Sequence, residues 1–124
     1  MRRINKIIIH CSATPEGREV NAETIDRWHR ERGFSMIGYH YVIGLNGQIE
    51  EGRPEKMVGA HCKGHNGESI GICYIGGMDK DNKEPKDTKH LPAPANKALV
   101  AIVNIARKYA HYDRQHTTRG AAAC

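Results

Sequence analysis

The amino-acid sequence predicts an α/β fold, with a mixed central β-sheet flanked by α-helices in a single domain. Three observations carry this prediction. Short, continuous apolar runs are typical of buried strands, an apolar stretch broken by Asn-Gly is typical of a β-hairpin, and two longer segments repeat apolar residues at helical spacing. The chain of 124 residues has the length of one domain, so we assign residues 1–124 to one folded unit.

The first strand and the first helix are marked by their ends. Residues 4–10 contain three consecutive isoleucines and are predicted to form a buried strand that ends at His10. Asn21 is a suitable N-cap for a helix over 22–33. Gly33 is a suitable stop for the same helix, because glycine adopts the left-handed conformation that often follows a helix.

The predicted hairpin occupies residues 39–52. Its turn is Asn46-Gly47, a pair that supplies the positive φ angles of a tight turn. Residues 53–67 are rich in glycine and polar side chains and are predicted as a loop.

The last part of the fold combines a strand, a loop and a helix. Residues 69–77 form a second apolar run, which ends in glycines, and residues 78–96 are polar and contain three prolines. A helix is predicted over 95–110, with Pro94 near its start. The apolar face of this helix is predicted to contain Leu99, Ile102, Val103 and Ala106.

Composition limits the classes of partner. The net charge of +5 permits anionic partners such as cell-wall polymers. We expect no nucleic-acid partner, because no dense Lys/Arg stripe with interleaved aromatic residues is present. We also expect no membrane partner and production in the cytoplasm, because the apolar run of "MRRINKIII" is too short for a signal peptide and no run has transmembrane length.

Five segments of the sequence together carry a resemblance to a known protein family. They are "IIIHCSAT", "IDRWHRERGF", "IGYHYVIGLNGQIEEGRP", "VGAHCKGHNGESIGICYIGG" and the late amphipathic helix. In this order, over about residues 4–110, they resemble the type 2 N-acetylmuramoyl-L-alanine amidases, a family that includes amidase-type phage lysozymes and the animal peptidoglycan recognition proteins. The resemblance implies a mixed sheet flanked by helices, one Zn²⁺ ion, and cleavage of the amide between N-acetylmuramic acid and L-alanine.

His10 is the first zinc ligand that the resemblance implies. A zinc ion polarises a carbonyl and lowers the pKa of a bound water, and a catalytic zinc keeps three protein ligands and one open position. A histidine at the carboxyl end of a buried strand is well placed for such a site. The alternative is a buried histidine of the core. The strand alternation turns Cys11 to the opposite side.

The other two ligands implied by the resemblance lie near the carboxyl terminus. The family has a histidine and a cysteine in the pattern H-x7-C, and "HTTRGAAAC" places His116 and Cys124 at this spacing. Two departures make segment 111–124 atypical. Ala122 occupies the position of a family lysine, and "AHYDRQ" is polar where an apolar strand is expected. Two alternatives therefore remain: both residues lie outside the site, or His111 replaces a ligand.

Tyr39 matches the active-site tyrosine of the family. A phenol beside the zinc can donate a hydrogen bond to the developing oxyanion. Tyr41 is the alternative residue for lining the groove, and His40 is expected to be structural. His61 matches a family histidine near the substrate, where it would orient the muramyl or peptide part or donate to the oxyanion. Asn66 and Ser69 follow in the same segment and are expected to contact the glycan or the peptide.

The sequence therefore predicts a monomeric, zinc-dependent amidase that acts on peptidoglycan. It resembles an endolysin of a phage or prophage, which is made in the cytoplasm and reaches the cell wall after release. A peptidoglycan-binding domain of the same fold without hydrolysis is the alternative, and Ala122 favours it. Resemblance alone adds a third reading, regulation of a host polymerase. Glu50 and Glu51 do not suit glycoside hydrolysis, because neighbours on one strand point to opposite faces.

Overall fold

The structure is a computed structural model that describes residues 2–15, 17–78 and 93–107. Its helices and strands follow the predicted order, with one additional pair of short strands and one 3-10 helix. In chain order they are β1 (Lys6–Cys11), β2 (Thr14–Pro15), α1 (Ala22–Glu31), β3 (Tyr41–Ile43), β4 (Ile49–Glu51), η1 (Asn66–Glu68), β5 (Ser69–Tyr74), β6 (Gly77–Met78) and α2 (Ala93–Ala106).

The central sheet is mixed, as predicted. Its strand order is β1-β5-β3-β4, and a separate two-stranded sheet pairs β2 with β6. Strand β5 runs parallel to both β1 and β3, whereas β3 and β4 form the antiparallel hairpin. The register pairs His10 with Cys73, so His10 lies near the carboxyl end of β1 and directly beside β5.

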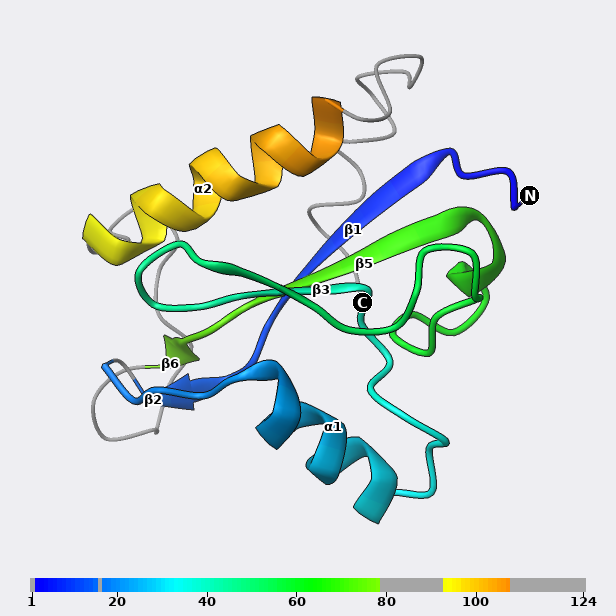
Figure 1. Cartoon of the computed structure of the whole chain (residues 1–124), viewed down its shortest axis with the longest axis horizontal. Coiled ribbons are helices and arrows are strands. Elements are labelled where there is room, and N and C mark those ends of the chain that lie inside the picture. Colours follow the sequence, from blue (N-terminus) through cyan, green and yellow to red (C-terminus); the bar gives the residue numbers. More distant parts are fainter. Residues whose placement is uncertain (1, 16, 79–92, 108–124) are drawn as a thin grey trace.

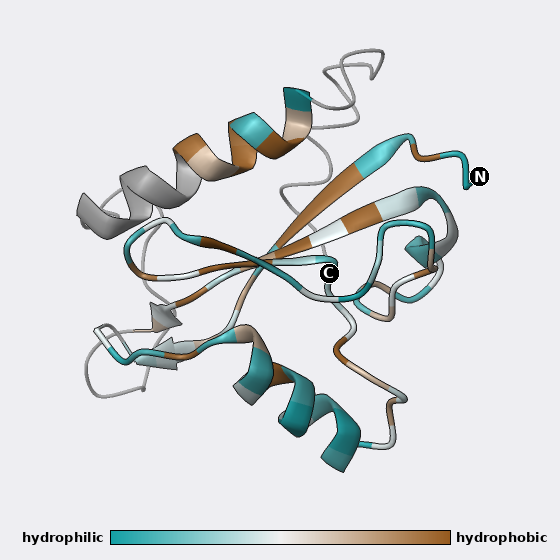
Figure 2. Cartoon of the chain, in the orientation of Figure 1, coloured by the Kyte–Doolittle hydropathy of each residue, from teal (hydrophilic) through white to brown (hydrophobic). Residues whose placement is uncertain are grey.

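The two helices lie on opposite sides of the central sheet (Figure 1). We call these sides the α1 face and the α2 face. The cluster on the α2 face is almost entirely aliphatic, and its buried members are Ile7, Tyr41, Ile43, Ile70, Ile72, Ala101, Ile102 and Ile105. The cluster on the α1 face is smaller, with the buried members Val20, Ile25, Ile37, Val42, Cys73 and Ile75. Figure 2 shows the corresponding apolar colouring of β1 and β5.

Helix α1 begins at Ala22 as the sequence predicts and ends at Glu31, two residues before the predicted end at Gly33. The side chain of Asn21 accepts a hydrogen bond from the backbone N–H of Thr24 at 2.8 Å. Gly33 has φ +97°, the left-handed conformation that glycine favours. The backbone N–H of Ala22 also donates to the carboxylate of Glu50 at 3.2 Å, which ties the start of the helix to the hairpin.

The hairpin is confirmed, but the prediction for its turn was wrong in one respect. Gly47 has φ +84°, whereas Asn46 does not take a positive φ angle. The N–H of Gly47 instead donates to the carbonyl of Gly44 at 2.9 Å, and the Asn46 side chain accepts from the N–H of Gln48 at 3.0 Å. The turn is therefore longer than a two-residue turn, and its single left-handed residue is glycine.

Helix α2 confirms the predicted late helix, with a different buried face. Ala101, Ile102 and Ile105 are buried, whereas Val103 is 50% exposed, so the placement of Val103 in the core was wrong. Successive helical residues turn by about 100°, and the face centred on 101, 102 and 105 therefore directs Val103 outward. The side chain of Leu99 lies outside the described residues. Within the described ranges, no helix has the length and apolar character needed to cross a bilayer.

Candidate active site

His10, Tyr39 and His61, which the sequence analysis singled out, lie side by side on the α1 face. The ring centroids of His10 and Tyr39 are 5.2 Å apart, and those of His10 and His61 are 5.0 Å apart at an interplanar angle of 81°. The rings of Tyr39 and His61 are 6.4 Å apart. His10 comes from strand β1, Tyr39 from the segment that leads into β3, and His61 from the loop before β5.

His10 and His61 are joined by a direct hydrogen bond. Nε2 of His10 lies 2.9 Å from Nδ1 of His61, and Nε2 of His61 lies 3.2 Å from Oγ of Ser69. Burial lowers the pKa of His10, and it lowers the pKa of His61 to about 3 with a further contribution from the His10 charge. Both imidazoles are therefore neutral at pH 7, and each ring has one N–H and one lone pair.

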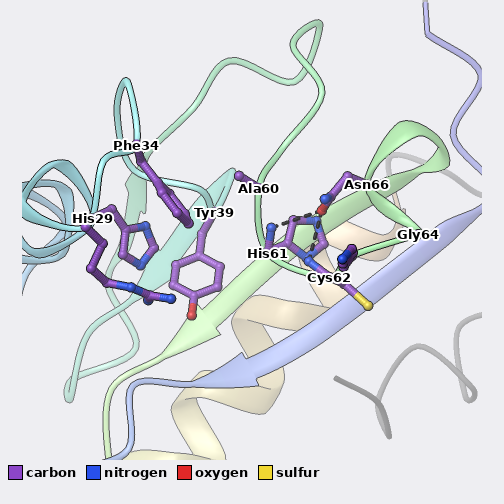
Figure 3. Close-up of a pocket in the computed structure, with 10 residues that line it drawn as sticks. His29, Phe34, Tyr39, Ala60, His61, Cys62, Gly64 and Asn66 are labelled. Atoms are coloured by element: carbon purple, nitrogen blue, oxygen red, sulfur yellow. Dashed lines mark hydrogen bonds between the residues drawn. The ribbon is translucent and has the colours of Figure 1, made fainter.

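Two glycines make room for the ring of His61. A Cβ at Gly71 of β5 would lie 2.5 Å from Cδ2 of His61, and a Cβ at Gly59 would lie 2.7 Å from the same atom. The ring therefore rests on bare backbone. The loop is fixed by Asn66, whose side-chain oxygen accepts from the N–H of His61 and from the N–H of Cys62, both at 2.9 Å (Figure 3).

Asn66 and Ser69 were expected to contact the substrate. In the structure both make hydrogen bonds within the loop that ends at β5, and the side chain of Ser69 is fully buried. Their direct contact with a glycan or a peptide stays a prediction. Both side chains contact His61, and Asn66 also contacts Cys62, a role that the sequence did not indicate.

Tyr39 lies between two histidines, with ring centroids 5.2 Å from His10 and 5.3 Å from His29. Burial raises the pKa of Tyr39 above its usual range, with the thiols of Cys73 and Cys11 as smaller contributions, so the hydroxyl stays protonated at neutral pH. A protonated phenol is a hydrogen-bond donor. Tyr39 therefore has the protonation state that its predicted role requires.

Tyr41 and His40 have other roles. Tyr41 belongs to the cluster on the α2 face and donates from its hydroxyl to the carboxylate of Glu55, so it lies on the opposite side of the sheet from Tyr39. The strand begins only at Tyr41, which is why simple alternation from residue 39 fails. His40 is structural, as expected: Nδ1 accepts from the N–H of Gly71 at 3.0 Å, and Nε2 lies 2.8 Å from the carbonyl of Met57.

A buried arginine holds the segment before Tyr39. Arg53 is 9% exposed, and its guanidinium donates to the carbonyl oxygens of Ile37 at 3.0 Å, Met36 at 3.2 Å and Val58 at 2.8 Å. It thereby joins the entry to β3 with the loop that leads to His61. Sequence reasoning missed Arg53, because one arginine in a polar loop gives no periodic signal.

A pocket of about 400 Å³ opens beside these residues. Tyr39, His61 and Asn66 line it together with the cationic side chains Arg32 and Lys63. Figure 3 shows Tyr39 and His61 from different segments bordering this pocket. A pocket with a buried phenol, neutral imidazoles and cationic residues suits a polar, anionic ligand.

The predicted zinc ligands are only partly described. His10 is placed as above, whereas His116 and Cys124, together with Ala122 and the alternative ligand His111, lie outside the described residues. Within the described ranges, no three His, Cys, Asp or Glu side chains form a group that could hold a metal ion. His10 is therefore the only member of the predicted ligand set that the described part of the structure positions.

Comparison with known proteins identifies the family of the chain. Residues 1–122 match the N-acetylmuramoyl-L-alanine amidase family. An endolysin of Enterobacteria phage T3 is 39% identical over 113 residues, which cover 86% of this chain and 74% of the phage protein.

Two solved structures have the same fold. The endolysin N-acetylmuramoyl-L-alanine amidase LysCS from Clostridium intestinale superposes with a TM-score of 0.68 at 31% identity, over 87% of this chain and 64% of LysCS. Drosophila PGRP-LB gives a TM-score of 0.68 at 27% identity, over 86% of this chain and 61% of that protein. The chain thus spans somewhat less than two thirds of either solved structure. With its sequence segments, its mixed sheet and these relatives in agreement, the chain belongs to the type 2 N-acetylmuramoyl-L-alanine amidase family.

Proposed function

We propose that the chain is an endolysin-like amidase that hydrolyses the bond between N-acetylmuramic acid and L-alanine in bacterial peptidoglycan, with Zn²⁺ as its cofactor. The observation that carries this proposal is the meeting of His10, Tyr39 and His61 on the α1 face, beside a pocket. The 39% identity to a phage endolysin supports the same assignment.

The side chain of His10 fits a zinc ion. Its imidazole is neutral at pH 7, and in the described part of the chain no hydrogen-bond partner faces Nδ1. Neutral imidazole nitrogen is a common zinc donor. In this proposal His10 holds the ion together with His116 and Cys124. When bound, the ion would polarise the scissile carbonyl and acidify a water molecule.

The side chains that line the pocket would have separate tasks. The hydroxyl of Tyr39 donates a hydrogen bond to the oxygen that becomes negative as the amide is attacked. Its raised pKa keeps the proton in place throughout. Arg32 and Lys63 give the pocket a positive charge, which suits the carboxylates of a stem peptide. Such an enzyme would act as a monomer, be made in the cytoplasm of the producing cell and act on the wall after release.

A peptidoglycan-binding domain without hydrolysis is the second candidate. The observation that favours it is Ala122, which stands where the family has a lysine. The likeness to PGRP-LB is compatible with either candidate. The two differ in one measurable product, because hydrolysis frees the amino group of L-alanine and binding does not.

Purified peptidoglycan tests the proposal directly. We expect zinc-loaded protein to release free L-alanine amino termini without new reducing sugars, and we expect a chelator to stop this release. Tyr39→Phe should bind the wall polymer and release far fewer amino termini. Sedimentation of the protein with peptidoglycan, with no amino termini released at any zinc concentration, would contradict hydrolysis and favour the binding domain.

A further inference from the structure

We propose that His61, supported by Ser69, is a positioning residue for His10, which holds the His10 imidazole with the proton on Nε2 and the lone pair of Nδ1 free for the metal. This inference rests on the proposed role of His10 as a zinc ligand. It assigns His61 a different task from the contact with substrate that the sequence predicted.

The hydrogen-bond chain has two possible directions. In the first, Nε2–H of His10 donates to Nδ1 of His61, and Nε2–H of His61 donates to Oγ of Ser69. In the second, every donor and acceptor is exchanged, and Nδ1 of His10 carries the proton. The serine hydroxyl can donate or accept, so the contacts allow both directions.

Only the first direction leaves a lone pair on Nδ1 of His10. A metal at this nitrogen therefore selects the first direction for the whole chain of three side chains. Histidine ligands generally donate their second ring N–H to a partner that fixes the ring, and loss of such a partner commonly weakens metal binding by about 10–100-fold. Here the partner is an imidazole at 2.9 Å, and no carboxylate or backbone carbonyl takes that position within the described residues.

The surroundings of His61 suit a fixed partner. Its ring lies against the backbone at Gly71 and Gly59, where a Cβ would come within 2.7 Å of ring atoms. The ring of His40 stands edge-on to it at 6.0 Å between centroids. Ser69, the last residue in this series of hydrogen bonds, is fully buried. These contacts fix the imidazole of His61, and its Nδ1 lies 2.9 Å from Nε2 of His10.

Zinc affinity of the full chain, measured by competition with a chromophoric chelator, tests the inference. We expect His61→Ala to bind zinc about 10–100-fold more weakly than the parent chain. Ser69→Ala, which removes only the far contact, should reduce the affinity by a smaller factor. His65→Ala is the matched control, because His65 lies in the same loop with a side chain that is 51% exposed, and its affinity should equal that of the parent.

The second readout is the ¹⁵N NMR spectrum of the histidine rings in the zinc-loaded chain, which distinguishes the two tautomers. We expect the Nε2–H tautomer for both His10 and His61. Two results would overturn the inference: zinc bound to Nε2 of His10, or equal zinc affinity of His61→Ala and the parent. The proposed function would still stand in either case if His10→Ala loses its zinc. Full zinc binding by His10→Ala, or no zinc binding by the parent, would overturn the proposed function as well.

Discussion

The two faces of the central sheet are built from different kinds of side chain, although they share the same strands. On the α2 face, Ile70 and Ile72 of β5 pack with isoleucines of β1 and α2. On the α1 face, the residue between them is Gly71, and the ring of His61 occupies the space that a side chain would fill. The α2 face is a packed apolar layer, whereas the α1 face combines a smaller apolar cluster with hydrogen-bonded histidines.

The main contribution to stability and the candidate active site therefore lie on opposite faces of a single sheet. Apolar burial, the main stabilising contribution to folding, is concentrated on the α2 face. The α1 face loses some of that burial to histidines and glycines, and its order depends on specific hydrogen bonds. Substitutions on the α2 face should therefore lower stability, whereas substitutions on the α1 face should mainly change the reaction or local order.

Ile72→Ala should give the largest loss of stability. Ile72 is fully buried in the α2-face cluster, and removal of its three outer carbons should lower the free energy of unfolding by about 2–5 kcal/mol. Denaturant unfolding measures the change. Val103→Ala is the control on the outer side of α2 and should shift stability by less than about 0.5 kcal/mol. Equal losses in the two variants would show that the α2 face is not the main core.

Tyr39→Phe should act on the reaction and leave the fold nearly unchanged. The ring remains, and only the protonated hydroxyl is lost. We expect kcat on peptidoglycan fragments to fall by about 10²–10³, the usual effect of removing one oxyanion donor. The unfolding curve should move little, since one hydrogen bond contributes about 1 kcal/mol. A variant with the parent kcat would make Tyr39 a packing residue of the α1 face.

Asn66→Ala should loosen the loop that carries His61. Two backbone N–H groups lose their acceptor, at a cost of about 1–3 kcal/mol. Amide hydrogen exchange should become faster at His61 and Cys62 and stay unchanged in β1. Asn46→Ala is the matched control, because the side chain of Asn46 accepts one backbone N–H in the exposed turn. Unchanged exchange at His61 would show that Asn66 does not hold this loop.

Asp26→Asn should have the smallest effect, visible only in the pH dependence of stability. A hydrogen bond from the backbone N–H of Ile37 lowers the pKa of the Asp26 carboxyl below its usual 3.8, and a hydrogen bond from the Arg30 side chain makes the next largest contribution. The unfolded chain then binds this proton more tightly, so the contribution of Asp26 is present above about pH 4 and is lost as the pH falls through the folded pKa. Melting temperatures of the two proteins should converge at low pH. A constant difference would exclude this linkage.

The sequence predicted the features that depend on local pattern. The Ile-rich strand with His10 at its end, the N-cap at Asn21 and the hairpin around Gly47 each follow from periodicity or from a single conformational preference. The family resemblance added Tyr39 and His61, which the structure brings beside His10 from distant parts of the chain.

The features that the sequence did not indicate are long-range contacts of polar side chains. Arg2 donates to the backbone carbonyls of Glu55 at 3.0 Å and Ser69 at 3.2 Å, and Arg53 joins two segments on either side of β4. The partners are backbone oxygens, which every residue has, so nothing in the sequence marks them. The pairing of β2 with β6 was also missed, because each strand has only two residues and so short a segment gives no periodic pattern.

The zinc content of the full chain tests the central claim, that the α1 face is a metal-dependent site anchored by His10. The parent, His10→Ala and His65→Ala would each be loaded with zinc, freed of loosely bound metal and analysed for zinc per chain. We predict that the parent and His65→Ala hold the same amount and that His10→Ala loses most of it. Equal zinc in all three proteins would contradict the claim, because His10 would then be an ordinary histidine of the α1 face.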